Sequence, residues 1–453
     1  MMIRKFAAKA GIIFLAAVFL NMGINSAATE NIQGDKDYII INPYETVNWK
    51  DFGQYKAGMH SHTIESDGYN TQREIIDDYY TKGYDIMAIT DHDVINTTGN
   101  REDLKPDDEL TERLKEVDAG IGRAGRAMKG IPFTSEQSMA SEHLNTYWAN
   151  FSNESGDTLE DNIAKCEELG GISHINHPGG AAQPPIENGQ ISPEVEELVN
   201  GYTDLYLKYP SCMGMEIFNR RYGNRENFRL YWDMVLMKTM PDRPIWAFSS
   251  DDAHHAGELG FNFNIMLMPQ NTEENVRYAM ENGTFYAVAL SAQSIADIDF
   301  DNINYPVIRN ISVNQDENSI SIEAENCDAI EWVADRRVIA TGSTIDLNDF
   351  EAEVNNYIRA QIKGSAGISC TQPFGIITKS GIKYGDVNGD NKVNSVDYAY
   401  IKRYILETSG YTLSGDCLLA ADVDGNGKVN SIDMAYIKRY ILEIISSFPA
   451  EGK

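Results

Sequence analysis

From residue 57 to residue 290, short apolar runs alternate with stretches whose apolar residues recur at helical spacing. Thr71 and Glu74 form the pattern of a capping box at the start of one such stretch, and glycine or proline follows the end of each. This alternation predicts an α/β fold with parallel strands. The predicted helices run from Thr71 to about Gly83, from Thr158 to Gly170, from Asn227 to Met240 and from Glu273 to Asn282.

Polar residues follow the predicted strands at their carboxyl ends. The strand 86–90 leads into Asp91 and His92, and the strand 171–176 leads into His177. In a parallel barrel the strand ends meet around one opening, where active sites assemble, so we expect these side chains to converge. Three further predicted strands also have polar residues at their carboxyl ends. They are 131–135 before Glu136, 213–219 with Glu216 and Asn219 near its end, and 244–249 before Asp251, Asp252 and His254.

The segment from Gly58 to Gly68 carries His60 and His62 one residue apart. On an extended strand both imidazoles point to the same side, so one ion can bind both, and Asp67 follows on the turn. The eight histidines all lie between residues 60 and 255, mostly beside carboxylates. Imidazole and carboxylate together suit Zn²⁺, Mn²⁺ or Fe²⁺. We therefore predict a divalent metal site.

Residues 305–378 have a different pattern, in which apolar and polar residues alternate. Ile320 and Ile322 are one example, and Ile358 and Ile362 belong to another. A period of two is typical of half-buried strands, and histidine is absent from this segment. We predict a small β-sandwich here, followed by a linker at 379–384.

The chain repeats itself after the linker. The segment from Asp386 to Asp397 matches the segment from Asp422 to Asp433 at an offset of 36 positions. Both copies carry oxygen side chains at loop positions 1, 3, 5, 9 and 12 and offer a lysine backbone carbonyl at position 7, as in EF-hand calcium loops. The predicted calcium ligands are Asp386, Asn388, Asp390, Lys392, Asn394 and Asp397, and then Asp422, Asp424, Asn426, Lys428, Asn430 and Asp433.

Length and charge narrow the class of protein. With 453 residues the chain exceeds one ordinary core, and two or three domains are expected. A formal net charge of −30 argues against nucleic-acid or membrane partners, which need basic surface.

Basic residues precede an apolar run from Ala10 to Leu20, and small residues follow at Ser26 and Ala28. Residues 1–28 are therefore predicted to be a secretory signal peptide, and the mature protein is expected outside the cell.

The repeated segment, over 385–447, resembles a type I dockerin. The resemblance implies two Ca²⁺ ions and tight docking onto a cohesin module of a scaffoldin, which would place the protein in an extracellular cellulosome. It also suggests that either copy of the repeat can face the partner. The implied cohesin-binding residues are Ser395, Val396, Lys402 and Arg403 in the first copy and Ser431, Ile432, Lys438 and Arg439 in the second.

The segment 29–304 resembles a PHP (polymerase and histidinol phosphatase) metal-dependent phosphoesterase domain. The resemblance rests on His60-x-His62, Asp91-His92-Asp93, Glu136, His177-Pro178 and Asp252-Ala253-His254. It implies a distorted (β/α)7 barrel and two or three Zn, Mn or Fe ions. The implied ligands are His60, His62, Glu136 and Asp252 for one ion, Glu136, His143 and His177 for a second, and Asp67, His92 and His254 for a third.

Several assignments stay open from the sequence. His174 competes with His143 for the same place and is otherwise structural, as is His255. Asp91 and Asp93 are expected to orient His92. Glu216 and Asn219 are candidates for contact with substrate. The candidates for phosphate binding, which equally fit a plain surface helix, are Arg220, Arg221, Arg225 and Arg229.

The predicted reaction is hydrolysis of a phosphoester by a metal-bridging hydroxide, with His60, His62, Asp252 and His254 as the catalytic residues. The substrate would be phosphorylated or derived from carbohydrate. One alternative is a cellulosomal polysaccharide-degrading hydrolase, of the glycoside hydrolase or the deacetylase/amidohydrolase type. Glycosidases use two carboxylates across a sugar cleft, whereas the carboxylates here accompany histidines. A second alternative is a non-catalytic binding subunit with a structural metal.

Overall fold

The computed structural model describes residues 38–99, 108–179, 191–220, 225–291, 304–378, 382–390, 392–406, 408, 412–413 and 415–452. The signal peptide predicted over 1–28 and residues 379–381 of the predicted linker lie outside the described residues.

Four helices lie where the apolar spacing predicts them: α1 (Gln72–Thr81), α3 (Leu159–Glu168), α5 (Arg225–Thr239) and α6 (Glu273–Asn282). The hydroxyl of Thr71 accepts a hydrogen bond from the Glu74 N–H, and the Glu74 carboxylate accepts one from the Thr71 N–H, which confirms the capping box. Gly283 ends α6 at φ 69°, a left-handed conformation that glycine adopts without strain.

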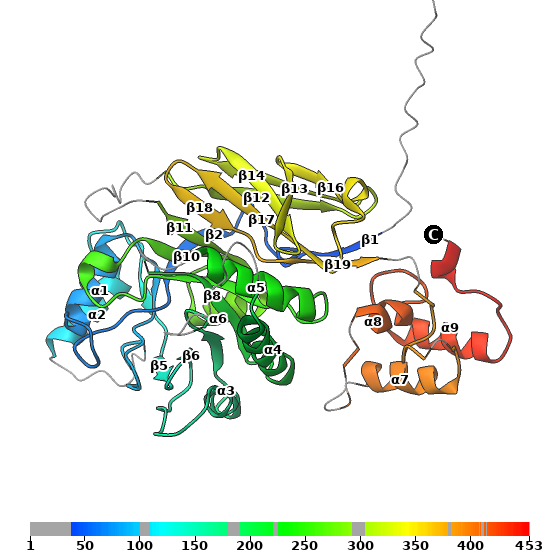
Figure 1. The fold of residues 1–453 in the computed structure, drawn as a ribbon, viewed down its shortest axis with the longest axis horizontal. Helices are drawn as coiled ribbons and strands as arrows, with labels where there is room; N and C mark the ends of the chain where they lie inside the picture. Colours follow the sequence, from blue (N-terminus) through cyan, green and yellow to red (C-terminus); the bar gives the residue numbers. More distant parts are fainter. Residues whose placement is uncertain are drawn as a thin grey trace, which may run out of the picture. The chain divides into compact units, whose positions relative to one another are not determined.

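Two helices lie where no helix was predicted, α2 (Glu109–Asp118) and α4 (Pro193–Lys208). The start of α4 carries a signal, because the Ser192 side chain accepts a hydrogen bond from the Val195 N–H and Pro193 stands in the first turn. Figure 1 shows α4 beside α5, and both pack against the strand Cys212–Asn219.

The first part of the chain forms short strands: β2 (Gly53–Gly58), β3 (Ile86–Met87), β4 (Lys129–Gly130), β5 (Ser135–Ser138), β6 (His143–Tyr147), β7 (Ile172–Ile175), β8 (Cys212–Asn219) and β9 (Trp246–Ser250). The pairs β2–β3, β3–β4, β7–β8 and β8–β9 are parallel. However, β6 runs antiparallel to both β5 and β7. The prediction of parallel strands is therefore wrong for β5 to β7, and Glu136 lies within β5 rather than after a strand.

Two single backbone bridges join the sheets that these strands form. Ser61, after β2, pairs in parallel with Ala253, after β9, and His92, after β3, pairs in parallel with Glu136 in β5. The pairing therefore runs from β2 through β3, β5, β6, β7, β8 and β9 back to the segment after β2. This closure brings the residues that follow β2, β3 and β9 to one place.

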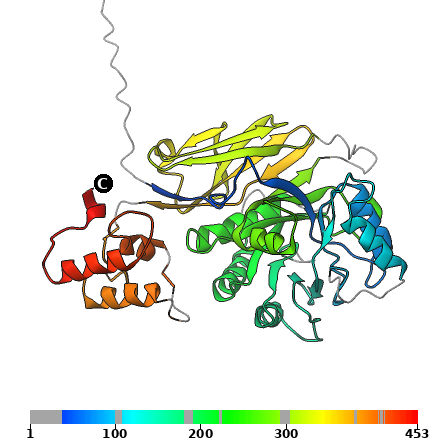
Figure 2. The ribbon, with the colours of Figure 1, turned by 180° about the vertical axis from the view of Figure 1, so that it is seen from behind.

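Five strands of residues 304–378 belong to a sheet that also contains strands of the first part of the chain. Strand β18 (Gly367–Cys370) pairs with β11 (Phe285–Leu290), which pairs with β10 (Asn262–Met268), and β10 pairs with β2. The sheet continues through β17 (Tyr357–Gly364) and β19 (Phe374–Thr378) to β1 (Tyr38–Ile41), which lies beside β19 in Figure 1 and Figure 2. The strands β14 (Ala329–Ala334) and β15 (Arg337–Thr341) extend it from β17.

A second, three-stranded sheet contains β12 (Val307–Asn314), β13 (Ser319–Glu325) and β16 (Thr344–Asp346). The alternating residues Ile320 and Ile322 of β13, and Ile358 and Ile362 of β17, are buried in one apolar core, as their period predicts. This core also contains residues of α1 and β10, such as Ile75 and Phe263. The strands of 304–378 thus share a core with the part of the chain that carries the histidines.

An ion pair ties β17 to α5. Two guanidinium nitrogens of Arg359 donate to the two carboxylate oxygens of Asp233, at 2.7 and 2.8 Å, and both side chains are at most 3% exposed. The Tyr357 hydroxyl donates to Asp233 as well, and the guanidinium lies over the Trp232 ring.

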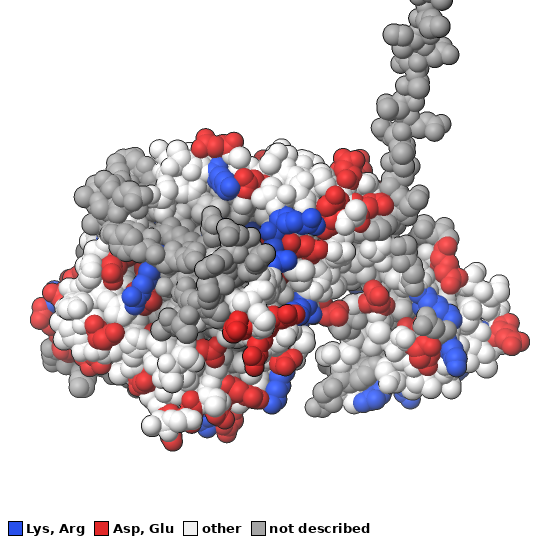
Figure 3. Space-filling model, viewed as in Figure 1, with Lys and Arg blue, Asp and Glu red and all other residues white. Residues whose placement is uncertain are grey.

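The repeated segment folds around its own core of Val387, Ile401, Val423, Ile437 and Phe448. It contains α7 (Ser395–Ile405), α8 (Gly415–Ala421) and α9 (Ser431–Ile441) and ends with a short 3-10 helix at Pro449–Gly452. Two other short 3-10 helices, Ala256–Glu258 and Leu347–Phe350, lie earlier in the chain. Figure 3 shows acidic and basic side chains interspersed on the visible face. In the described part of the chain, no helix is long and apolar enough to cross a bilayer.

Candidate metal centre

His60 and His62 enter the interior together at the end of β2. Their Nε2 atoms are 3.2 Å apart, and both side chains are fully buried. Ser61 lies between them and donates a hydrogen bond in another direction, to the carbonyl oxygen of Ala88. The alternation of side chains along an extended segment therefore supplies the pair, as the spacing predicts.

Glu136 lies at the centre of the histidines. Its Oε2 atom is 3.2 Å from Nε2 of His60, 3.3 Å from Nε2 of His62 and 3.0 Å from Nδ1 of His92. Oε2 is buried, yet it makes no hydrogen bond of acceptable geometry with any described residue. Three imidazole nitrogens thus surround this oxygen, but none of them donates a hydrogen bond to it.

The other oxygen of Glu136 faces a second set. Oε1 is 3.1 Å from Nδ1 of His143 and 3.3 Å from Nε2 of His177, and it accepts a 2.7 Å hydrogen bond from Nδ2 of Asn176. His143 reaches this place because β6 returns antiparallel beside β5 and pairs His143 with Ser138. Asn176 was not predicted as a site residue, although it directly precedes His177.

Asp252 is the second carboxylate beside His60 and His62. Its Oδ1 atom is 3.2 Å from Nε2 of His62 and 3.5 Å from Nε2 of His60. Its backbone has φ 48°, and that of His177 has φ 22°. Left-handed backbone costs a residue other than glycine about 1–3 kcal/mol and is concentrated at functional sites. Two site residues therefore hold a strained conformation that the surrounding fold maintains.

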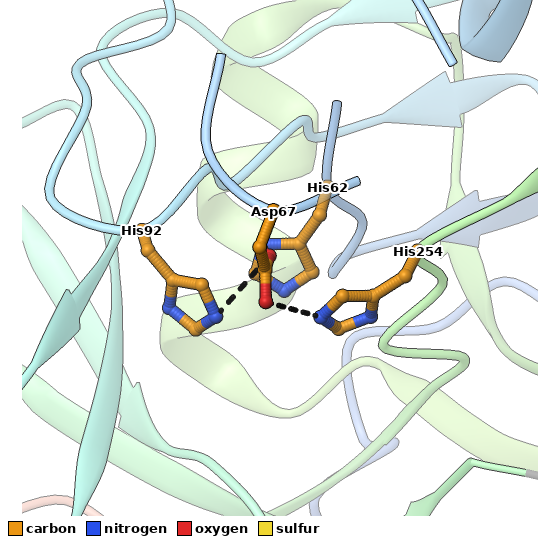
Figure 4. A group of neighbouring side chains, drawn as sticks. All are labelled: His62, Asp67, His92 and His254. Atoms are coloured by element: carbon orange, nitrogen blue, oxygen red, sulfur yellow. Dashed lines mark ion pairs between the residues drawn. The ribbon is translucent and has the colours of Figure 1, made fainter. Parts of the chain in front are cut away.

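Asp67 collects a third set at the exposed side, as Figure 4 shows. Its carboxylate lies 3.6 Å from Nε2 of His92, 3.2 Å from Nε2 of His254 and 3.8 Å from Nδ1 of His62. The Asp67 side chain is 57% exposed, whereas Glu136 is fully buried. The site is therefore accessible from the side of Asp67.

These donors fit divalent metal ions. Three sets have their ligand atoms within 4.8 Å of one another, and imidazole nitrogen with carboxylate oxygen is the donor set of Zn²⁺, Mn²⁺ and Fe²⁺. The hydrogen-bond deficit of Glu136 Oε2 among imidazoles is also what a bridging cation would satisfy. The sets are His60 with His62 and Asp252, His92 with Glu136 and His143, and His62 with Asp67, His92 and His254.

The charges of the site favour a cation. Burial alone would lower the pKa of His60, but Glu136 and Asp252 outweigh it and raise that pKa well above its ordinary value. For His62, burial is likewise outweighed by the neighbouring carboxylates of Asp252 and Glu136, which raise the pKa to about 9. Burial would raise the pKa of Glu136, but His60, His143 and His177 hold it well below its ordinary value. The carboxylates thus stay ionised and attract positive charge.

Asp91 and Asp93 differ in what they support. Asp91 accepts hydrogen bonds from the Thr63 N–H and hydroxyl and from the Ser66 hydroxyl, so it holds the turn that presents Asp67 instead of orienting His92. Asp93 accepts from the N–H of Ser138, whose hydroxyl lies 2.6 Å from Nδ1 of His92. Asp93 therefore acts on His92 through Ser138.

His174 and His255 lie elsewhere. Nε2 of His174 is 2.9 Å from the Tyr147 hydroxyl and its ring stacks on Phe248, and burial lowers its pKa to about 4, so it is neutral. His255 is half-exposed and lies 3.5 Å from Glu258. It is His143, and not His174, that lies beside Glu136.

The remaining candidates are divided between buried and exposed positions. Glu216 and Asn219, proposed for substrate contact, are buried and hydrogen-bonded to each other. Arg220 is half-exposed, donates to Asp252 at 2.7 Å and contacts the His254 ring. The guanidinium of Arg229 lies over the Phe218 ring. Arg221 and the side chain of Arg225 lie outside the described residues.

The two repeated loops have the same internal geometry. The Asp397 carboxylate accepts from the N–H groups of Asn388 and Asn394, and the Asp433 carboxylate accepts from those of Asp424 and Asn430. Asp397 and Asp433 are fully buried, and burial raises the pKa of both carboxyl groups. Asp422, Asp424 and Asp433 bring their oxygens within 4.8 Å of one another.

The family model of the dockerin type I domain matches residues 384–442. Residues 384–442 are a type I dockerin domain. Its loop residues Ser395 and Val396, and the corresponding Ser431 and Ile432, are all exposed. So are the basic pairs of helices α7 and α9, Lys402 with Arg403 and Lys438 with Arg439. Both copies therefore present a serine, a β-branched apolar residue and a Lys-Arg pair to solvent.

Solved structures similar to the chain fall into two groups. A two-domain protein containing a predicted PHP-like metal-dependent phosphoesterase from Bacteroides vulgatus is 17% identical, with 74% of this chain and 89% of that chain covered and a TM-score of 0.39. An amidohydrolase from Chromobacterium violaceum is 16% identical, with 45% and 88% covered and a TM-score of 0.29.

The second group matches the dockerin. A type I cohesin–dockerin complex from Clostridium thermocellum contains a chain that is 44% identical, with 15% of this chain and 94% of that chain covered and a TM-score of 0.14. Comparison with curated proteins gave no match.

Proposed function

We propose that the histidine-rich part of the chain is a metal-dependent hydrolase of the PHP type, acting on phosphoesters. The observation that carries this proposal is the convergence of five imidazoles on the two oxygens of one buried carboxylate, Glu136. A structural zinc site needs only four ligands in one closed shell, whereas this set is larger and reaches the exposed Asp67. Its size and its accessibility both support catalysis over a purely structural metal.

The proposed ligands divide among two or three ions of Zn, Mn or Fe. His60, His62 and Asp252 would hold one, Glu136 would bridge it to another at His143 and His177, and Asp67, His92 and His254 would hold a third. Such ions supply a water of lowered pKa and polarise a phosphoryl oxygen. The protein's part is to hold the ligands at fixed positions, which the backbone bridges Ser61–Ala253 and His92–Glu136 support.

Arg220 favours an anionic substrate. It lies beside Asp252 and His254 with a side chain that is 51% exposed, so its guanidinium is placed at the accessible side of the site. A guanidinium matches the geometry of phosphoryl oxygens. Asp252 and His254 stand on the same side, and we assign to them the transfer of the proton that hydrolysis requires.

The test is a panel of phosphomonoesters, phosphodiesters, acetyl esters and amides, assayed with the metal-loaded protein and after chelation. We expect the metal-loaded protein to hydrolyse phosphoesters. Chelation should abolish this activity, and added Mn²⁺ or Zn²⁺ should restore it. The His60→Ala variant should lack the activity. Phosphoester hydrolysis that survives both chelation and His60→Ala would overturn the mechanism. Turnover of acetyl esters alone would replace the phosphoesterase with a deacetylase on the same metal site.

We further propose that the dockerin binds two Ca²⁺ ions and docks the enzyme onto a cohesin module of a scaffoldin, as a secreted component of a cellulosome. The burial of Asp397 and Asp433 supports calcium, because a buried carboxylate needs a compensating cation. The exposed Val396 and Ile432, each preceded by an exposed serine, support docking through either copy.

Cohesin binding by the full chain tests this second part. Removal of Ca²⁺ should abolish binding, and a change of Ser395 and Val396 together to Asp should leave it nearly intact because Ser431 and Ile432 remain. Only the same change in both copies should abolish it. Loss of binding from one changed copy would contradict the two-way mode.

A further inference from the structure

Glu216 is a fully buried carboxylate that belongs to none of the proposed ligand sets. It lies in β8, and its Oε1 atom is 2.9 Å from Nδ1 of His60. Its other oxygen accepts hydrogen bonds from two N–H donors, which is the arrangement of an ionised carboxylate. An ionised carboxylate can only accept hydrogen bonds, and Nδ1 of His60 therefore carries the proton.

The tautomer follows from this contact. Because Nδ1 donates to Glu216, Nε2 is the ring nitrogen of His60 that can bind an ion, and binding displaces the proton from it. That atom faces Glu136 at 3.2 Å and Asp252 at 3.5 Å. A metal accepts electrons from an unprotonated ring nitrogen, and a carboxylate behind the ring raises the basicity of that nitrogen.

The second oxygen of Glu216 acts on a different ligand. Oε2 accepts hydrogen bonds from the backbone N–H of His177 and from Nδ2 of Asn219, both at 2.8 Å. His177 has φ 22°, so its backbone needs support from its surroundings. The contact holds the residue in the conformation that brings its ring to 3.3 Å from Glu136.

We propose that Glu216 is a positioning residue of the metal centre, which fixes the tautomer of His60 and the backbone of His177 and thereby sets the affinity for the ions that these two residues hold. The inference rests on the proposed function and adds one residue to it. It replaces the sequence-based interpretation of Glu216 as a contact of the substrate, because the side chain is fully buried behind His60.

The experiment compares Co²⁺ binding by the full chain and by Glu216→Gln, after removal of metals, using calorimetry and the visible absorption of Co²⁺. Glutamine has nearly the same shape but no charge, and its single amide oxygen cannot accept from both the His177 N–H and Nδ1 of His60. We expect the Kd of the tightest ion to rise by about 10–100-fold and the Co²⁺ spectrum to change. Glu216→Asp, which keeps the charge, should recover part of the affinity.

A control separates positioning from stability. Asp85 is also fully buried, and its carboxylate accepts from the guanidinium groups of Arg123 and Arg126. Asp85→Asn should lower the melting temperature of the metal-free protein and leave the Kd for Co²⁺ unchanged. Wild-type Kd and spectrum in Glu216→Gln would overturn the inference, as would an equal loss of affinity in Asp85→Asn. Failure of the wild-type protein to bind Co²⁺ would instead overturn the proposed function.

Discussion

At the scale of single residues, Glu136 is the side chain on which the proposed metal centre depends most. Each of its oxygens faces a different set of imidazoles, so the loss of its charge affects both sets. An amide in its place offers one oxygen and one N–H₂ group, and the N–H₂ group cannot ligate a cation. We therefore expect a substitution of Glu136 to weaken metal binding more than a substitution of a ligand that belongs to only one set.

We expect Glu136→Gln to weaken metal binding at least about 100-fold, which corresponds to about 3 kcal/mol, and to reduce the number of ions bound per chain. The measurement is metal content after dialysis, followed by titration. Glu168→Gln removes the same charge from a side chain that is 69% exposed on α3, and it should bind metal like the wild type. Equal metal content in the two variants would contradict a bridging role.

Residue spacing predicts some of the site and not the rest. The pairing of His60 with His62 follows from the two-residue period of an extended chain, which is a local property. The placement of Asp91 on Thr63 and Ser66, and of Glu216 behind His60, depends on contacts between residues far apart in the sequence. No local pattern encodes such contacts, so the hydrogen bonds of Asp91 and the place of Glu216 behind His60 could not be predicted.

At the scale of elements, helix caps and the spacing of apolar residues predicted where helices begin and end, whereas the direction of a strand could not be predicted. The start of α1 and the end of α6 were predicted from Thr71, Glu74 and Gly283, because the signals act within one turn. The antiparallel course of β6 was not predicted, since apolar runs of buried strands look alike in either direction. That course is what delivers His143 to Glu136.

The cap of α1 gives a test at this scale. Thr71→Ala removes the acceptor for the Glu74 N–H and should lower the free energy of unfolding by about 1 kcal/mol. Thr81→Ala, at the other end of the same helix, removes a hydroxyl that donates to the Asp78 carbonyl and should have a smaller effect. Chemical denaturation of both variants measures the difference, and equal effects would show that the cap is not the cause.

At the scale of the whole molecule, residues 304–378 are joined to the histidine-bearing part by paired strands and by the buried ion pair of Asp233 with Arg359. Removal of one partner leaves the other charged and buried. We expect Asp233→Ala to cost about 3–5 kcal/mol in the free energy of unfolding. The double variant Asp233→Leu with Arg359→Met should recover much of that loss, because no charge is left buried. A double variant as unstable as the single one would contradict this account.

The dockerin has a separate core, and calcium should stabilise that core alone. At a free Ca²⁺ concentration 100 times the Kd, binding adds about 2.7 kcal/mol to the stability of the part that binds it. Calorimetry of the full chain should therefore show one unfolding transition that moves upward with Ca²⁺ and a second that does not. Movement of both transitions together would contradict the independence of the two cores.

Anomalous diffraction from crystals of the protein grown with Mn²⁺ tests most directly whether Glu136 and the eight side chains around it hold divalent ions. We predict anomalous peaks at bonding distance from both oxygens of Glu136, with His60, His62, Asp252, His143 and His177 as further ligands. The absence of such peaks at Glu136, with Mn²⁺ present only in the dockerin loops, would contradict the claim.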